Sequence, residues 1–253
     1  MPASEFSGRT AVVIGATAGI GLATAQAFAA AGARVAFAGL GAAEGKRIER
    51  ELIAQGAEAL FIEADVRREG DVRAVIEGAS RRFGRIHAAV NNAGTEGGFG
   101  PVQNTTDSDF DLLIGVNLRG IWHGLKHEIA HMLAHGGGAI VNTASSAGLT
   151  GIANVALYTA SKHAVVGLTK ATALELAASN IRVNAVAPGP VETGLLHRMV
   201  DGHIPISAIA ATVPMNRIAQ PQEIAGAIVW LCSDAASYVT GHTMAIDGGL
   251  TAA

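Results

Sequence analysis

The stretch that decides the fold reads TAVVIGATAGIG over residues 10–21. Its first five residues are β-branched or apolar, which is typical of a buried strand, and the run ends at Gly15. The glycines follow the pattern GxxxGxG, and a helix-prone, alanine-rich run occupies residues 22–31. Glycines let the backbone approach a phosphate closely, and a helix N-terminus offers free N–H groups. The stretch therefore predicts a nucleotide-phosphate turn, although a plain turn stays open in a chain with 32 glycines.

The same alternation of strand and helix continues to the end of the chain. Strands are predicted over residues 10–14, 34–37, 59–63, 86–90, 139–143, 181–187 and 243–246. Helices are predicted over residues 22–31, 44–55, 69–83, 107–135 with an interruption near Gly115, 157–178 and 222–232. Strands that are apolar throughout and alternate with helices indicate an α/β protein, with a seven-stranded parallel sheet covered by helices on both faces. Residues 1–253 form one domain, and only residues 188–221 read as a long loop.

Composition excludes several classes of protein. The net charge is −3 with no basic block, so neither nucleic acid nor a membrane surface is an expected partner. A single cysteine, Cys232, permits no internal disulfide and lies in an apolar run, which favours a buried thiol over a nucleophile. Residues 1–6 have no signal-peptide pattern, and no apolar run approaches the length of a membrane span. We expect a cytoplasmic protein.

Tyr158 and Lys162 are the most informative pair in the second half of the chain. At a spacing of four residues on a helix, both side chains project from one face. An ammonium near a phenol stabilises the phenolate and makes it a usable base. Such pairs are common on exposed helix faces, so the pair alone is weak support for catalysis.

Other motifs occur in a fixed order around this pair. They are Asn91-Asn92-Ala93-Gly94, Val116-Asn117-Leu118-Arg119-Gly120, Ser145 thirteen residues before Tyr158, Pro188-Gly189, Thr193, Val239-Thr240-Gly241 and Asp247-Gly248-Gly249. With the glycine turn and Tyr-x-x-x-Lys, they resemble the short-chain dehydrogenase/reductase family over essentially the whole length. The resemblance implies a single-domain Rossmann fold. Two departures are Ile14, where the family usually has threonine, and Ala144, where it usually has serine.

The resemblance implies a role for each member of a catalytic set formed by Asn117, Ser145, Tyr158 and Lys162. Tyr158 would exchange a proton with the substrate oxygen, and Lys162 would favour the phenolate and bind the nicotinamide ribose. Ser145 would orient the carbonyl or alcohol by a hydrogen bond. Asn117 would hold a water that links Lys162 to solvent. Each polar residue also has a plainer interpretation: Ser145 as a turn or cap residue, and Asn117 as a hydrogen-bonding group at a helix interruption.

The resemblance also implies which residues bind the cofactor. They are Gly15, Thr17, Ala18, Gly19, Ile20, Gly21, Gly39, Leu40, Asp65, Val66, Asn92, Ala93, Gly94, Tyr158, Lys162, Pro188, Gly189, Val191 and Thr193. Asp65 would accept from the adenine amine, or else be an exposed turn residue. Thr193 would bind the carboxamide, a role compatible with capping a helix.

Residues 38–41, Ala-Gly-Leu-Gly, bear on the choice of cofactor. An acid at position 39 is typical of NAD selectivity, and arginine at position 40 or a basic residue at position 18 is typical of NADP selectivity. This chain has Gly39, Leu40 and Ala18. Because a 2′-phosphate without a cation costs more than an unpaired hydroxyl, we favour NAD(H), with NADP(H) possible. Lys46 or Arg47 could reverse the preference.

The substrate pocket is expected from residues 95–101, 146–155 and 195–215. Its predicted substrate contacts are Ser145, Val155, Tyr158, Leu195 and Met199. These segments are mostly apolar, and Arg198 is their only arginine or lysine, which favours an apolar ketone or secondary alcohol. The same residues could simply pack a lid, expected at about 190–215, against the core. His197 and His203 have no third ligand nearby, so no metal site is predicted.

The first function hypothesis is an NAD(P)-dependent alcohol dehydrogenase or carbonyl reductase acting on a small molecule. A non-catalytic NAD(P)-binding sensor or regulator on the same fold is the alternative. Retention of Asn117, Ser145, Tyr158 and Lys162 favours the enzyme. The resemblance further implies a homotetramer, with the helix from residue 157 and residues 248–253 as candidate interface elements.

Overall fold

The computed structural model describes residues 5–200 and 204–252, and within them seven strands form one parallel sheet. The strands are β1 (Thr10–Ile14), β2 (Arg34–Gly39), β3 (Ala59–Glu63), β4 (Ala88–Asn91), β5 (Gly138–Thr143), β6 (Ile181–Pro188) and β7 (Thr243–Ile246). Their order across the sheet is β3-β2-β1-β4-β5-β6-β7. The predicted α/β fold is confirmed, and no predicted strand end is wrong by more than two residues.

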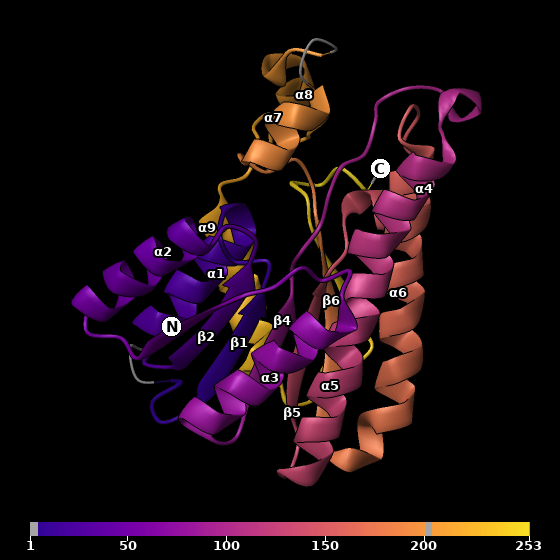
Figure 1. Cartoon of the computed structure of the whole chain (residues 1–253). Coiled ribbons are helices and arrows are strands. Elements are labelled where there is room, and N and C mark those ends of the chain that lie inside the picture. The colour runs from indigo at the N-terminus through magenta and orange to yellow at the C-terminus, as the bar shows by residue number, and fades with distance from the viewer. Residues whose placement is uncertain (1–4, 201–203, 253) are drawn as a thin grey trace.

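Helices cover both faces of the sheet (Figure 1). One face carries α1 (Gly19–Ala30), α2 (Ala42–Ala54) and α9 (Pro221–Cys232), and the other carries α3 (Glu69–Phe83), α5 (Gly120–Ala134) and α6 (Ala156–Leu176). Successive side chains of a strand point to opposite faces of the sheet, so Val13 packs with the first group of helices and Val12 with the second. Both cores are buried, which explains why the strands are apolar on both faces.

Two sequence predictions of helix position were wrong. The first helix begins at Gly19, not at residue 22, because the last two glycines of the motif form its first turn. Residues 188–221 are not only loop: they contain α7 (Gly194–Val200) and α8 (Ile206–Thr212). Each is only two turns long, too short for a helical period to stand out in the sequence.

The predicted interruption near Gly115 is a π-helical segment, Ile114–Arg119, between α4 (Asp107–Leu113) and α5. Such segments often mark functional positions because they reorient one side chain within a continuous helix. Here the side chain concerned is Asn117, which is completely buried.

The strand order reverses between β1 and β4, because the chain passes to β2 on one side of β1 and to β4 on the other. Parallel α/β sheets bind ligands outside the carboxyl ends of the strands at such a point. The glycine turn follows β1, and Asn92 to Gly94 follow β4. The topology therefore brings these two motifs together at one edge of the sheet. In the part of the chain that the structure describes, no helix is both long and apolar enough to cross a membrane.

A buried polar chain joins the sheet to the helices on one face. Asn91 donates from Nδ2 to Glu128 Oε2 (2.9 Å) and to Asn142 Oδ1 (3.0 Å), and Asn142 donates to Thr169 Oγ1 (3.0 Å). Among the described residues, Glu128 Oε1 has no hydrogen-bond partner. Burial raises the pKa of Glu128 to about 7, so this carboxyl group holds its proton in weak acid.

Glu128 is expected to make folding stability depend on pH. Between pH 4.5 and pH 7 the unfolded chain releases this proton while the folded chain keeps it, so stability falls as pH rises and levels off above pH 7. The loss is on the order of 3 kcal/mol, from 1.36 kcal/mol per pKa unit. In Glu128→Gln this contribution should vanish, because the amide oxygen can still accept from Asn91.

Urea unfolding of wild type and Glu128→Gln between pH 5 and pH 8 measures the effect. The exposed Glu77→Gln on α3 is the matched control and should follow wild type. Parallel stability curves for wild type and Glu128→Gln would contradict the assignment.

Candidate active site

The glycine turn is shaped for close backbone contact. Gly15 has φ +85°, and a Cβ there would lie 2.4 Å from Ala93 N. A Cβ on Gly21 would lie 2.0 Å from Gly15 O and 2.6 Å from Asn92 Nδ2. The first turn of α1 is preceded by Ala18, whose side chain has no acceptor for the free N–H groups. This cradle fits the pyrophosphate of a dinucleotide, whose negative charge the helix N-terminus stabilises.

Asn92 braces this turn. Its Nδ2 donates to Gly15 O (2.9 Å), and its Oδ1 accepts from Thr143 Oγ1 (3.1 Å). The side chain thus links the ends of β1, β4 and β5. Gly39 packs against the same turn, since a Cβ there would lie 2.9 Å from the Thr17 side chain. The next residue, Leu40, is 64% exposed.

Lys162, Asn117 and Gly94 converge at the carboxyl ends of β4 and β5. Lys162 is 3% exposed and donates from Nζ to Thr143 O (2.9 Å). A Cβ on Gly94 would lie 3.5 Å from Asn117 Oδ1 and 3.6 Å from Lys162 Nζ. Burial lowers the pKa of the Lys162 ammonium to about 8, so the group is mostly charged at pH 7 and can still exchange its proton.

Tyr158 lies one helical turn before Lys162, whose Nζ is 5.7 Å from the centre of the phenol ring. Burial raises the pKa of the Tyr158 phenol, a hydrogen bond with Ser145 partly offsets this, and the charge of Glu96 raises it further. Ser145 Oγ also accepts from Ala147 N (3.2 Å), so it caps a 3₁₀ turn as well as facing the phenol. In the chain alone, therefore, the phenol is protonated at neutral pH.

Asn117 makes three side-chain hydrogen bonds. Its Oδ1 accepts from Thr95 N (2.8 Å), and its Nδ2 donates to Thr95 O (3.0 Å) and Ser161 Oγ (3.1 Å). The amide therefore holds the loop after β4 against α6, which is the plainer role allowed by the sequence. It does so within reach of Lys162, so the geometry is also compatible with a proton path.

Asp65 and Val66 follow β3, as predicted. Arg67 Nη2 lies 2.6 Å from Asp65 Oδ2, and this pairing holds the pKa of the carboxyl group below its usual range. Val66 is buried and packs so closely against Gly120 that a Cβ added there would lie 2.7 Å from Val66 Cγ2. Asp65 is thus ionised and already paired on one side.

The segment after β6 returns to the glycine turn. A Cβ on Gly189, which follows Pro188, would lie 2.8 Å from Asp247 Cα. Val191 forms an isolated bridge with Ala219. Thr193 Oγ1 accepts from Leu196 N (3.3 Å), and its Cγ2 lies 3.2 Å from where a Cβ on Gly19 would be. Thr193 therefore caps α7 and also approaches the phosphate turn.

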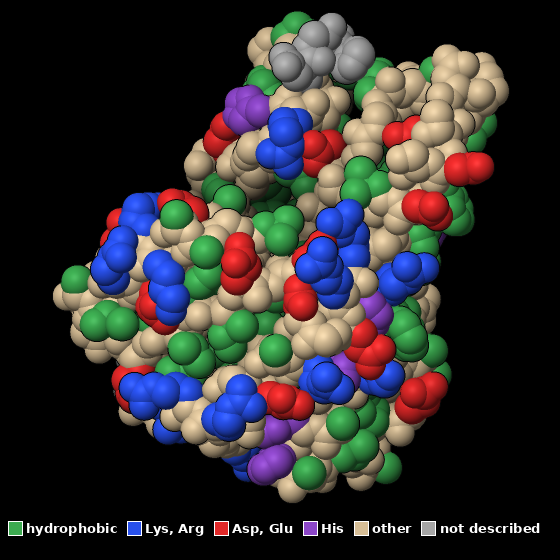
Figure 2. Space-filling model, in the orientation of Figure 1, with side chains coloured by type: hydrophobic (Ala, Val, Ile, Leu, Met, Phe, Trp, Pro, Cys, Tyr) green, Lys and Arg blue, Asp and Glu red, His purple; other side chains and the backbone are tan. Residues whose placement is uncertain are grey.

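Apolar side chains surround the phenol. Buried Leu113, Ala147, Val155 and Tyr158 pack together with partly buried Phe99, Leu157 and Met199. Of the predicted substrate contacts, Val155, Tyr158 and Met199 belong to this cluster, whereas Ser145 and Leu195 are not part of it. In Figure 2 the surface is hollowed beneath the segment that carries α7 and α8.

Sequence reasoning missed Leu113 as a site residue, and it placed Glu96 and Ala147 within the pocket segments without assigning either a role. Leu113 precedes the π-helical segment and packs with Tyr158, a contact between residues 45 positions apart that spacing does not reveal. Glu96 pairs with Arg198 of α7, a contact between residues 102 positions apart. Among residues 5–200 and 204–252, no group of three His, Cys, Asp or Glu side chains could hold a metal ion. His197 is half exposed and pairs with Glu192, and His203 lies outside the described residues.

A dinucleotide cradle beside a buried tyrosine and lysine and a half-buried serine defines a nicotinamide-dependent oxidoreductase of the Rossmann type. Residues 15–251 match the family described as Enoyl-(Acyl carrier protein) reductase. The chain belongs to the short-chain dehydrogenase/reductase family.

Known relatives agree with this class. The chain is 37% identical to a cyclohexanol dehydrogenase of Acinetobacter sp. (strain SE19), covering 98% of this chain and 97% of the relative. The crystal structure of levodione reductase has a TM-score of 0.94 and 37% identity, with 98% and 99% coverage. A 3-ketoacyl-(acyl-carrier-protein) reductase from Brucella melitensis, complexed with NADH, has a TM-score of 0.91 and 34% identity, with 97% and 99% coverage. The chain is therefore a catalytic NAD(P)-dependent dehydrogenase or reductase of alcohols and ketones, not a sensor.

Proposed function

We propose that the chain interconverts a secondary alcohol and its ketone whose carbon skeleton is mostly apolar and compact enough to lie against the apolar cluster around Tyr158. The observation that carries this is the packing of Phe99, Val155 and Met199 in the cluster of the phenol, to which Ser145 is hydrogen-bonded. A cyclic secondary alcohol, the class to which the relative's cyclohexanol belongs, is the first choice of substrate. A panel that compares cyclic alcohols with phosphorylated and carboxylated analogues tests this, and turnover of only the anionic compounds would overturn it.

In the proposed mechanism Tyr158 removes the alcohol proton, and Ser145 holds the same oxygen by a hydrogen bond. An oxidised nicotinamide bound at this site would supply the hydride acceptor, and its positive charge would favour the phenolate. Lys162 would hold the ribose hydroxyls, and its ammonium would exchange protons near the phenol. The contacts of Asn117 fix Thr95 and Ser161 beside this path, so its side chain keeps the proton-transfer groups in place.

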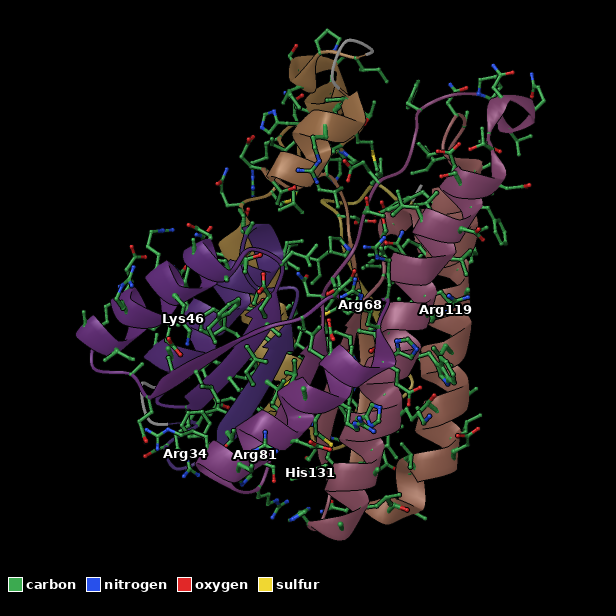
Figure 3. All side chains as sticks on the ribbon, in the orientation of Figure 1. Arg34, Lys46, Arg68, Arg81, Arg119 and His131 are labelled. Carbon is green, nitrogen blue, oxygen red and sulfur yellow. The ribbon has the colours of Figure 1, made fainter. Side chains whose placement is uncertain are left out.

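For the cofactor we propose a preference for NAD(H). Lys46 Nζ is 2.8 Å from Glu49 Oε2, and Arg47 is paired with Glu44 and Glu51 on the same helix (Figure 3 labels Lys46). Both cations considered as partners of a 2′-phosphate are therefore neutralised by neighbouring carboxylates. This supports the NAD(H) preference that Gly39 and Leu40 indicate.

The dissociation constants of NADH and NADPH, from fluorescence titration, should differ by about tenfold or more in favour of NADH, the effect of about 1.4 kcal/mol. In Leu40→Arg the difference should shrink or reverse, since the guanidinium can pair with a 2′-phosphate. Ile53→Arg, a similar exposed change at the end of α2, is the control. Tighter binding of NADPH by the wild type would show the assignment to be wrong.

We also propose a homotetramer. Trp122 and Leu133 on α5 and Leu174 on α6 are 48%, 54% and 83% exposed, so they are available for contact with second copies of the chain. Burial of these side chains in such contacts would remove apolar surface from water, and residues 248–252 are further candidates for contact. Light scattering should give four times the chain mass, and a monomer would exclude the proposal.

A further inference from the structure

Glu96 and Arg198 form a two-point ion pair beside the cluster that contains Tyr158. Arg198 Nε lies 2.6 Å from Glu96 Oε1, and its Nη2 lies 3.2 Å from Oε2. Glu96 belongs to the loop after β4, and Arg198 belongs to α7. The Glu96 side chain is only 12% exposed, whereas that of Arg198 is 63% exposed. The pair therefore joins a fixed inner carboxylate to a cation on the outer helix.

Both partners are held close to the catalytic set. Asn117 makes two hydrogen bonds to the backbone of Thr95, which fixes the residue before Glu96. Met199, the residue after Arg198, packs in the apolar cluster that contains Tyr158. The ion pair and the apolar contact consequently hold α7 against the loop after β4 and the cluster that contains Tyr158.

The charges around the phenol give this pair a consequence for catalysis. The charge of Glu96 raises the pKa of Tyr158, whereas the hydrogen bond with Ser145 lowers it. Lys162 lies on the tyrosine's own helix, 5.7 Å from the ring centre. On α7, Arg198 is the cation that faces Glu96, and His197 pairs outward with Glu192. An unpaired Glu96 would leave a partly buried negative charge beside a phenol that must itself become negative.

We propose that Arg198 is a positioning residue that neutralises Glu96, so that the contact of α7 with the loop after β4 favours the readiness of Tyr158 to act as base. The proposal rests on the proposed function for its role in turnover. Without the guanidinium, the charge of Glu96 would stand unopposed beside the phenol and would make its proton harder to remove.

The two tyrosines of the chain allow a direct test that does not depend on activity. Tyr238 is fully exposed, so Tyr238→Phe provides a folded background in which Tyr158 is the sole phenol. Phenolate absorbance is titrated in this background, with circular dichroism to confirm that the chain stays folded. Arg198→Met should move the midpoint to higher pH and Glu96→Gln to lower pH. The double variant should match Glu96→Gln, because Arg198 acts only through Glu96.

Arg9→Met is the matched control, because Arg9 pairs with Asp234 at 2.5 Å in the same type of ion pair. Figure 3 labels Arg34 at the end of the molecule opposite α7. Arg34 donates to the backbone oxygen of Gly8, the residue before Arg9, so the Arg9–Asp234 control pair lies far from α7. Arg9→Met should leave the midpoint where it is. An unchanged midpoint in Arg198→Met, or a double variant that differs from Glu96→Gln, overturns the proposal.

Turnover supplies the second readout, in the chain with both tyrosines and with a cyclic alcohol as substrate. Arg198→Met should lower kcat/KM at pH 7 by about fivefold and recover at alkaline pH, as expected for one charge near the base. Arg198→Lys should restore most of the loss, and Glu96→Gln should rescue Arg198→Met. If the wild type turns over no alcohol, the proposed function fails, while the phenol titration still decides whether Arg198 acts on Tyr158 through Glu96.

Discussion

Tyr158→Phe is expected to lower kcat/KM for oxidation of a secondary alcohol by about 1,000-fold, within the usual contribution of a positioned acid or base. The ring keeps its place in the apolar cluster, so only the hydroxyl is lost. Without it, neither Ser145 nor Lys162 can take its place, because the serine hydroxyl is a far weaker base and the ammonium is bonded to Thr143 O. The loss should therefore fall on the proton-transfer step.

Steady-state kinetics with the favoured cofactor measures this loss. The dissociation constant of the cofactor should change by no more than a few fold, since the glycine turn that holds the pyrophosphate is untouched. Tyr238→Phe removes the other phenol from a fully exposed position and should retain wild-type activity. Near wild-type oxidation by Tyr158→Phe would refute the role given to the tyrosine.

Gly21→Ala is expected to weaken cofactor binding by at least about 100-fold, equivalent to about 2.7 kcal/mol. The new Cβ would lie 2.0 Å from Gly15 O, a backbone atom that cannot rotate away, and 2.6 Å from Asn92 Nδ2. The turn has to open, which separates the N-terminus of α1 from the end of β1. The free energy of unfolding should also fall by about 1–3 kcal/mol, as for other overpacked sites.

Cofactor titration and urea unfolding together measure both effects of Gly21→Ala. Gly226→Ala in α9 is the matched control, because a Cβ there meets nothing within 4 Å. It should bind cofactor normally and gain up to about 1 kcal/mol of stability from its higher helix propensity. Equal cofactor affinity in Gly21→Ala and wild type would show that this glycine does not shape the phosphate site.

The local chemistry of the residues was enough to predict most of the fold. Runs such as residues 11–14 and 139–141 are apolar on both faces, which favours a parallel sheet covered by helices on both sides. The motifs after β1, β4 and β5 lie at strand ends, and parallel strands bring their carboxyl ends to one edge. This reasoning places Gly15, Asn92 and Ser145 at one edge, and the resemblance to the short-chain dehydrogenase/reductase family added Tyr158 and Lys162 of the following helix to the same site.

Residues 188–221 mark the limit of that reasoning. Their helices are short, and α7 is held by contacts with distant segments: Thr193 against Gly19, Met199 against the phenol cluster, and Arg198 against Glu96. None of these partners is near in sequence, so neither spacing nor periodicity could reveal them. The helix start at Gly19 was missed for a similar reason, since the glycines read as a turn until their contacts with Asn92 are known.

The sequence by itself therefore determined the sheet, the nucleotide edge and the chemical groups available there, because periodicity and strand-end motifs are local properties of the chain. Only the tertiary structure decided what surrounds the phenol. Burial raises the pKa of Tyr158 and lowers that of Lys162 to about 8, and the Glu96–Arg198 pair lies beside the phenol cluster. Desolvation and charge interactions depend on distances through space, which residues far apart in the sequence acquire only when the chain folds.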